Sequence, residues 1–320
     1  MGTNFSHGAN FATIGSTIRR QNTTIFQSGF SPISLDIQYA QFSNFLKRAQ
    51  IIRRKGGVFN DLFPEEYKFS SALYTFDIGQ NDLTAGYDLN MSTEQVIAYV
   101  PDVISEFITT IKNVYDLGGR AFWIHNTGPV GCLPYILDTQ VITAAQVDKH
   151  GCAAPFNDVS KYFNRKLKEA IDQLRKNLHL AAITYVDIYS VKYSLIAQSK
   201  KLGTFIQMYP LLGLVQWVPA HASRAHRFGN PFLVCCGHGG KYNFNNAMRC
   251  GSTKFVNGTE IVIAKSCEDP SSRIIWDGIH FTEVANRWIY SQIADGAYSD
   301  PPVPLNMACH RKDDLRRYYL

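Results

Sequence analysis

Residues 71–82 read SALYTFDIGQND, and this stretch decides the fold class. Its first eight residues form a compact and mostly apolar run, which is typical of a buried strand. The run ends in the polar residues 79–82, which we interpret as a loop at the carboxyl end of that strand. Further strands are predicted at 121–125 and 182–186, with helical patterns between them. Strands that alternate with helices predict an α/β domain with a parallel, helix-covered sheet.

The helices are predicted from apolar residues at helical spacing and from the signals at their ends. One covers residues 42–56, and a second opens with a capping box at residues 92–95. A third places apolar residues along one face between positions 159 and 178. A last helix is predicted to begin at Thr282, whereas residues 203–270 are predicted to be irregular.

The composition is that of a soluble globular protein, with 45% hydrophobic and 18% charged residues among 320. No repeat or linker divides the chain, so one domain is predicted over residues 1–310, followed by a tail at 311–320. The formal net charge is +6, but the basic residues are scattered, so no nucleic-acid partner is expected. No apolar run reaches the roughly 18 residues of a transmembrane helix, and no Cys-x-x-Cys occurs. Neither a metal nor a cofactor is expected.

Seven cysteines and four Asn-x-Ser/Thr sequons together favour an oxidising, secretory compartment. The first 20 residues contain no apolar segment, so the chain itself is expected to carry no signal peptide. Proximity suggests the pairs Cys132–Cys152 and Cys236–Cys250 but leaves the connectivity open, and the odd count implies one free or intermolecular thiol. The sequons lie at Asn4, Asn22, Asn90 and Asn257.

The clearest candidate for a catalytic motif lies in residues 276–283, WDGIHFTE. Asp277 and His280 are three residues apart and directly precede a predicted helix. Asp277 can accept a hydrogen bond from one ring nitrogen of His280 while the other nitrogen takes a proton from a hydroxyl group. This is the logic of a catalytic triad. The alternative is a helix cap or a surface hydrogen bond, which short Asp/His pairs often form.

Two further segments offer hydrogen-bond donors for a developing oxyanion. The side-chain amide of Asn81 can stabilise negative charge without adding a titrating group. The backbone N–H of Gly15 is a second candidate, because glycine lets a substrate approach the backbone closely. Taken alone, each segment is better explained as a turn or loop that contains glycine.

Five segments combine these features in a fixed order along nearly the whole chain. They are GANFATIGSTI at 8–18, FDIGQND at 76–82, NTGPVGCLP at 126–134, CCGHGGKYN at 235–243 and WDGIHFTEVAN at 276–286. In this order they resemble the plant GDSL esterase/lipase family, a branch of the SGNH hydrolases. The resemblance implies a flavodoxin-like, three-layer α/β/α fold, secretion, and hydrolysis of carboxylic esters by a Ser–Asp–His triad.

The resemblance also implies roles for the candidate residues. Gly15 and Asn81 correspond to the two oxyanion donors, His280 to the general base and Asp277 to the residue that orients it. The implied substrate is a small-molecule or lipid ester. The acyl group, the alcohol group and the oligomeric state are left open.

One part of the family pattern is missing. The family's nucleophilic serine lies in a Gly-Asp-Ser segment after the first strand, and this chain contains no Gly-Asp-Ser. Ser6 and Ser16 are the nearest hydroxyls, but neither lies in the required strand-to-helix turn. We therefore expect an N-terminally incomplete domain that lacks the internal first strand and the nucleophile, and that is inactive as printed.

Two other functions remain as alternatives. A protein that keeps the cleft without the nucleophile would bind acyl or glycan ligands without turnover. By resemblance, a glycan hydrolase similar to the α-L-fucosidases is the third possibility.

Overall fold

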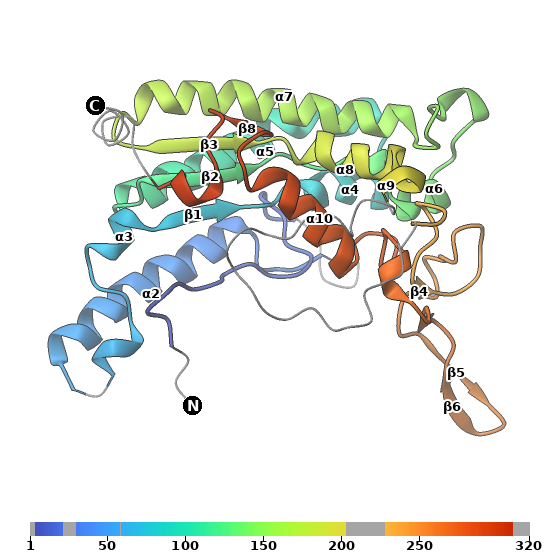
Figure 1. Ribbon diagram of the computed structural model, residues 1–320, viewed down its shortest axis with the longest axis horizontal. Coiled ribbons are helices and arrows are strands. Elements are labelled where there is room, and N and C mark those ends of the chain that lie inside the picture. Colours follow the sequence, from blue (N-terminus) through green and yellow to red (C-terminus); the bar gives the residue numbers. More distant parts are fainter. Residues whose placement is uncertain (1–3, 22–29, 58, 203–227, 310–320) are drawn as a thin grey trace. The chain divides into compact units, whose positions relative to one another are not determined.

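The computed structural model describes residues 4–21, 30–57, 59–202 and 228–309 (Figure 1). The chain divides into two compact units. The first contains residues 1–127, 159–187 and 294–320, and the second contains residues 128–158 and 188–293. The single domain predicted over residues 1–310 stays a prediction, and the predicted tail at 311–320 lies outside the described residues.

A four-stranded sheet forms the centre of the first unit, in the order β1-β2-β3-β8. The strands β1 (Leu73–Phe76), β2 (Ala121–His125) and β3 (Ala182–Val186) are parallel, and β8 (Ser299–Asp300) pairs with β3 in the antiparallel direction. The three parallel strands lie where the sequence predicts them. Among the described residues β1 pairs with β2 alone, and the prediction of a further strand upstream stays a prediction.

Helices lie on both sides of this parallel-dominant sheet, as in a three-layer α/β/α fold (Figure 1). They are α2 (Leu35–Lys55), α3 (Lys68–Ser71), α4 (Gln80–Asp88), α5 (Thr93–Asp116) and most of α7 (Ala154–Asn177). The capping box of α5 is confirmed, because the Ser92 side chain accepts from the Gln95 N–H and the Gln95 side chain accepts from the Ser92 N–H. None of the described helices is long and apolar enough to cross a membrane.

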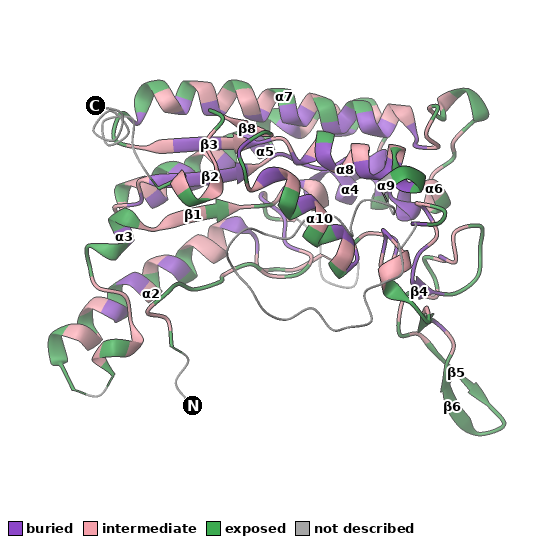
Figure 2. Cartoon of the chain, in the orientation of Figure 1, coloured by how far each residue is buried: buried purple, intermediate pink, exposed green. Residues whose placement is uncertain are grey.

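The core of the first unit follows the apolar periodicity of these elements (Figure 2). Phe122 and Ile124 in the central strand β2 are both completely buried. The inward faces of α5 and α7 add Val103, Phe107, Ile111, Phe163, Leu167 and Ile171. Burial of such side chains contributes about 1.5–3 kcal/mol each to the stability of this unit.

The second unit consists of short elements linked by irregular segments. The helices α8 and α10 pack against each other. Its elements are α6 (Pro134–Thr139), α8 (Ile188–Ala197), α9 (Ser199–Leu202), α10 (Glu283–Ile293), β4 (Cys236–Gly237), β5 (Thr253–Val256), β6 (Thr259–Val262) and β7 (Lys265–Ser266). Across both units, the described residues also form the 3-10 turns η1 (Asn60–Leu62), η2 (Val130–Cys132), η3 (Ala144–Gln146), η4 (Pro270–Ser272) and η5 (Leu305–Met307).

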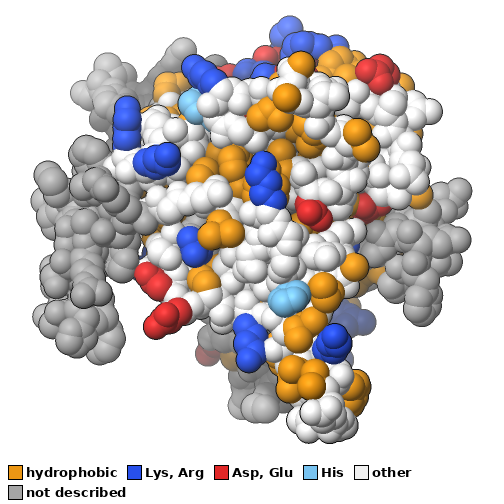
Figure 3. All heavy atoms as spheres, turned by 90° about the vertical axis from the view of Figure 1, so that its right-hand side faces the viewer, with side chains coloured by type: hydrophobic (Ala, Val, Ile, Leu, Met, Phe, Trp, Pro, Cys, Tyr) orange, Lys and Arg blue, Asp and Glu red, His pale blue; other side chains and the backbone are white. Residues whose placement is uncertain are grey.

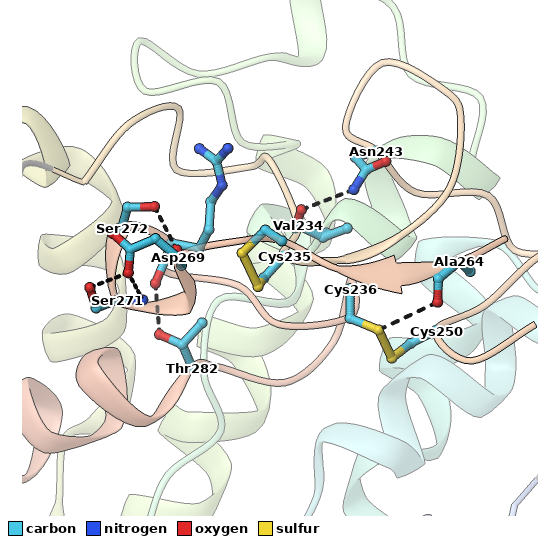
Figure 4. The surroundings of a disulfide bond; sticks show 12 residues. Val234, Cys235, Cys236, Asn243, Cys250, Ala264, Asp269, Ser271, Ser272 and Thr282 are labelled. Carbon is cyan, nitrogen blue, oxygen red and sulfur yellow. Dashed lines mark hydrogen bonds between the residues drawn. A yellow bond between two sulfur atoms is a disulfide. The ribbon is translucent and has the colours of Figure 1, made fainter. Parts of the chain in front are cut away.

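Three disulfides fasten the second unit. The predicted pairs Cys132–Cys152 and Cys236–Cys250 are confirmed, and a third bond joins Cys235 to Cys267. The adjacent residues Cys235 and Cys236 thus bond to different partners (Figure 4). Cys309 is an exposed free thiol, as the odd count implies.

The prediction that residues 203–270 are irregular is only partly correct. Residues 203–227 lie outside the described residues, but residues 253–262 form the antiparallel hairpin of β5 and β6. Every residue in the two strands is exposed. On the face seen in Figure 3, Lys and Arg side chains are scattered among uncharged groups. That no nucleic acid binds remains a prediction.

Candidate active site

Asp277 and His280 lie on a short closed loop of the second unit. An isolated antiparallel bridge joins Ile275 to Phe281, and the Trp276 N–H donates to the His280 carbonyl at 2.7 Å. One carboxylate oxygen of Asp277, Oδ1, accepts from the backbone N–H groups of Ile279 at 3.0 Å and of His280 at 2.9 Å. The other oxygen, Oδ2, lies 2.7 Å from His280 Nδ1. The loop backbone therefore fixes the carboxylate, and the carboxylate fixes the imidazole ring.

The electrostatics of the pair favour a negatively charged carboxylate beside a protonated imidazole. Burial by itself raises the pKa of Asp277, but hydrogen bonds from the His280 ring and backbone outweigh it and hold that pKa below its ordinary value. The hydrogen bond to Asp277 raises the pKa of His280, while burial and the charge of Lys192 oppose this rise. The His280 side chain is 54% exposed. With the Nδ1 proton donated to Asp277, Nε2 is the ring nitrogen that can accept a proton from a hydroxyl group.

The segment that carries Cys235 and Cys236 forms backbone hydrogen bonds with the residues that lead into this loop. The Cys235 N–H donates to the Ile275 carbonyl at 3.0 Å, and the Cys236 N–H donates to the Trp276 carbonyl at 2.6 Å. On the far side of the loop, the Thr282 hydroxyl donates to the Arg273 carbonyl at 2.7 Å (Figure 4). The same hydroxyl accepts from the Ala285 N–H at the start of α10, so the helix predicted to begin at Thr282 begins one residue later, at Glu283.

A glycine and an aromatic ring complete the support of the loop. Gly278 has φ of 96°, which favours glycine, and a Cβ built there would lie 2.5 Å from two ring atoms of Phe244. The Gly278 carbonyl also accepts from the Tyr135 N–H at 3.1 Å, and the rings of Tyr135 and Phe244 meet edge to face. Gly278 is therefore held against the ring of Phe244, a residue more than 30 positions away in the sequence.

Asn81 belongs to the first unit, and its environment corrects the prediction of a polar loop at 79–82. Gly79 has φ of 122° and is the N-cap of α4, so Asn81 lies in the first helical turn. The Asn81 Nδ2 donates to the Ser16 carbonyl at 2.8 Å. A side-chain amide has two N–H donors, and this bond engages one of them. The structure thus brings Asn81 next to the residue that follows Gly15.

Asp82 is a residue whose part in this arrangement the sequence does not reveal. Its carboxylate accepts from the backbone N–H groups of Ile18 at 2.8 Å and of Arg19 at 3.0 Å. Burial raises the pKa of Asp82 to about 7, against the opposing effect of these two hydrogen bonds. Asn81 and Asp82 together fasten the loop that carries Gly15 to the start of α4. The signal for Asp82 in the sequence is the position of an aspartate in the first turn of an apolar helical pattern, where acidic residues are favoured.

The serines weighed as nucleophiles have other contacts. The buried Ser16 hydroxyl donates to the Ile33 carbonyl at 2.7 Å, whereas the contact that Ser6 makes is through its backbone N–H, to the Asn4 side chain. Within the described ranges, no three His, Cys, Asp or Glu side chains are grouped so that they could hold a metal ion. The structure brings Asp277 to His280 in one unit and Asn81 to the Gly15 loop in the other.

Comparisons with known proteins assign a family to this arrangement. The family model GDSL-like Lipase/Acylhydrolase matches residues 1–293. A GDSL esterase/lipase of Arabidopsis thaliana is 55% identical over 311 residues, which cover 97% of this chain and 76% of the relative. An esterase of Hevea brasiliensis is 51% identical, covering 99% and 74%, and alpha-L-fucosidase 3 of Arabidopsis thaliana is 48% identical, covering 98% and 75%. The chain therefore belongs to the family of GDSL-like lipases and acylhydrolases, and is a carboxylic ester hydrolase by that resemblance.

Proposed function

We propose that the chain supplies the acid–base pair and the oxyanion donors of a Ser–Asp–His ester hydrolase. The observation that carries the proposal is the Asp277 carboxylate, held by two backbone N–H groups and placed 2.7 Å from His280 Nδ1. In this role Nε2 of His280 takes the proton of the nucleophilic hydroxyl and later gives it to the leaving alcohol. The Gly15 N–H and the Asn81 amide stabilise the negative charge that develops on the carbonyl oxygen.

The proposal assigns the nucleophile to a serine outside these 320 residues. Ser16 is 5% exposed and its hydroxyl is bonded to the Ile33 carbonyl, so it is poorly suited to attack an ester. The 320-residue chain would then keep the acid–base pair and lack turnover. The substrate class is a small-molecule or lipid ester, in keeping with the family.

A second candidate is glycan hydrolysis, because one relative carries the name alpha-L-fucosidase. Glycoside hydrolysis ordinarily uses two carboxyl groups on either side of the scissile bond. The partner of Asp277 is an imidazole, which suits the activation of a hydroxyl nucleophile instead. We therefore place ester hydrolysis first.

One experiment compares two proteins, the 320-residue chain and the same chain extended by the region encoded upstream. The extended protein is expected to hydrolyse p-nitrophenyl acetate and to be labelled by a fluorophosphonate, because it would carry the activated serine. The 320-residue chain is expected to do neither. Labelling of the short chain, or no ester hydrolysis by an extended protein that contains Gly-Asp-Ser, would contradict the proposal. Release of fucose from a fucosylated oligosaccharide, without ester hydrolysis, would favour the second candidate.

We also propose that the protein is secreted and glycosylated. Three disulfides fit an oxidising compartment, and the sequon asparagines Asn90 and Asn257 are exposed, the second in the turn between β5 and β6. Produced with its upstream region in plant cells, the protein is expected in the medium with a glycan on Asn257. Mass spectrometry before and after peptide-N-glycosidase digestion tests this, and an unmodified Asn257 in secreted protein would contradict it.

A further inference from the structure

Lys192 of α8 lies beside the loop that carries the acid–base pair, within the second unit. Its Nζ lies 5.1 Å from the centre of the Phe281 ring, and Phe281 directly follows His280. The charge of Lys192 is close enough to His280 to act against the rise of the imidazole pKa. A cation therefore faces the neighbourhood of the proposed general base.

The fold makes room for this lysine at Gly128. A Cβ built on Gly128 would lie 2.9 Å from Lys192 Cδ, 3.7 Å from its Nζ and 3.9 Å from its Cε. Gly128 is not among the glycines with positive φ, so the turn itself does not require glycine there. The missing side chain instead lets the lysine stem pass close to the backbone, which directs its ammonium toward Phe281.

The ammonium of Lys192 has no anionic partner in the part of the chain that the structure describes, where no ion pair within 4.0 Å includes it. By contrast, Lys168 pairs with both Asp172 and Asp300. Lys192 is half-buried, and its ammonium lies over the face of an aromatic ring, which stabilises a cation less than an anion does. A partly desolvated charge of this kind gains most from an anion that arrives with a ligand.

We propose that Lys192 forms an anion-binding subsite next to His280, which takes a carboxylate or phosphate group carried by the ester substrate. The proposal rests on the proposed ester hydrolysis and narrows its substrates to esters with an anionic group near the scissile bond. Phe281 forms the apolar side of the subsite, and the lack of a side chain at Gly128 leaves room for the lysine stem. Asp277 and Lys192 are the charged groups that act on His280.

The first test uses the 320-residue chain and needs no turnover. The His280 ring protons are followed by NMR over pH, with succinate or inorganic phosphate as the added anion. Either anion is expected to raise the His280 pKa saturably by about half a unit, since a unit charge several ångströms away has an effect of this size in a partly solvated site. In Lys192→Met the anion response is expected to vanish, and the pKa without anion is expected to rise.

The matched control is Lys241→Met. Lys241 belongs to the same unit, and its Nζ lies 5.2 Å from the centre of the Tyr242 ring, so it makes the same kind of contact without acting on His280. This variant is expected to keep the full anion response. A response in Lys192→Met equal to that of the unmodified chain would overturn the proposal, and so would no saturable response to either anion. A stronger response to phosphate assigns a phosphate-bearing ester, and a stronger response to succinate assigns a carboxylate-bearing one.

A second measurement distinguishes the anion-binding subsite from the proposed ester hydrolysis. In the extended protein, Lys192→Met is expected to raise the KM of a monosuccinate ester about tenfold relative to that of the corresponding acetate ester. Lys241→Met is expected to leave this ratio unchanged. If the extended protein hydrolyses neither ester but the short chain still binds anions through Lys192, the proposed hydrolysis fails and the subsite stands. An unchanged KM ratio in Lys192→Met, in a protein that hydrolyses both esters, overturns the subsite alone.

Discussion

Replacement of His280 by alanine in the extended, serine-bearing protein is expected to lower kcat for ester hydrolysis by about six orders of magnitude. Alanine leaves no group to take the proton from the nucleophilic hydroxyl, and the residual rate comes from the oxyanion donors and binding. Asp277→Asn is expected to cost about four orders of magnitude, because the imidazole then loses its orienting carboxylate. Initial rates with p-nitrophenyl acetate measure both effects.

The control is His238→Ala, an exposed histidine of the same unit that lies outside the pair. It is expected to retain full activity, and an equal loss in this variant would show that the assay reports folding.

The pH profile adds an independent check. Since the hydrogen bond to Asp277 raises the pKa of His280 above 6.5, kcat/KM should fall on the acid side with a midpoint above that value. The midpoint should move to lower pH in Asp277→Asn, and an unmoved midpoint would argue against the pair.

The second large effect concerns stability, with Gly278→Ala as the variant. Its φ of 96° costs about 1–2 kcal/mol for a residue with a Cβ, and the displacement of the Phe244 ring adds about 1–3 kcal/mol. The free energy of unfolding is therefore expected to fall by about 2–5 kcal/mol. Urea denaturation of the 320-residue chain measures the loss.

Gly258→Ala is the matched control for this variant. Gly258 has a similar φ of 78°, but a Cβ built there meets nothing within 4 Å. Only the backbone cost of about 1–2 kcal/mol is expected from it. If the two alanine variants lose equal stability, the Phe244 ring does not hold the loop that carries Asp277 and His280. Gly278→Ala should also lower the His280 pKa, because displacement of the loop disturbs the hydrogen bond that His280 Nδ1 donates to Asp277.

The regular part of the fold is visible in the sequence because its signals are local. The strands at 73–76, 121–125 and 182–186 are apolar runs, each preceded by a helical pattern. The start of α4 is not visible in the same way. Gly79, Asn81 and Asp82 are all turn formers, and only the backbone shows that Gly79 caps a helix.

The hairpin of β5 and β6 shows a different limit. Its turn is Asn257-Gly258, with φ of 49° and 78°, which is a strong hairpin signal. The flanking strands are exposed on both faces, so they lack the alternation of apolar and polar residues that identifies a strand. Because that alternation is missing, the prediction of an irregular segment is wrong here despite the turn signal.

Within the candidate site, the spacing of residues decides what can be predicted. Asp277 and His280 are three positions apart, so their hydrogen bond follows from one short motif. The hydrogen bonds that the Asp82 carboxylate accepts from the backbone N–H groups of Ile18 and Arg19 join positions more than 60 apart. No local pattern in the sequence indicates them. The catalytic roles carried over from the family remain predictions, which the His280 and Asp277 variants test.

The pairing of residues 235–236 with 275–276 has a practical consequence for anyone who produces this protein. Two adjacent cysteines, each bonded to a different partner, donate backbone hydrogen bonds to the segment that leads into Asp277. If Cys235 and Cys236 exchanged partners during oxidation, the central sheet would be unaffected while the segment before Asp277 lost its register. Spectra that report secondary structure would then look native in a preparation in which His280 is displaced. Disulfide mapping, rather than circular dichroism, is the appropriate quality test for recombinant material.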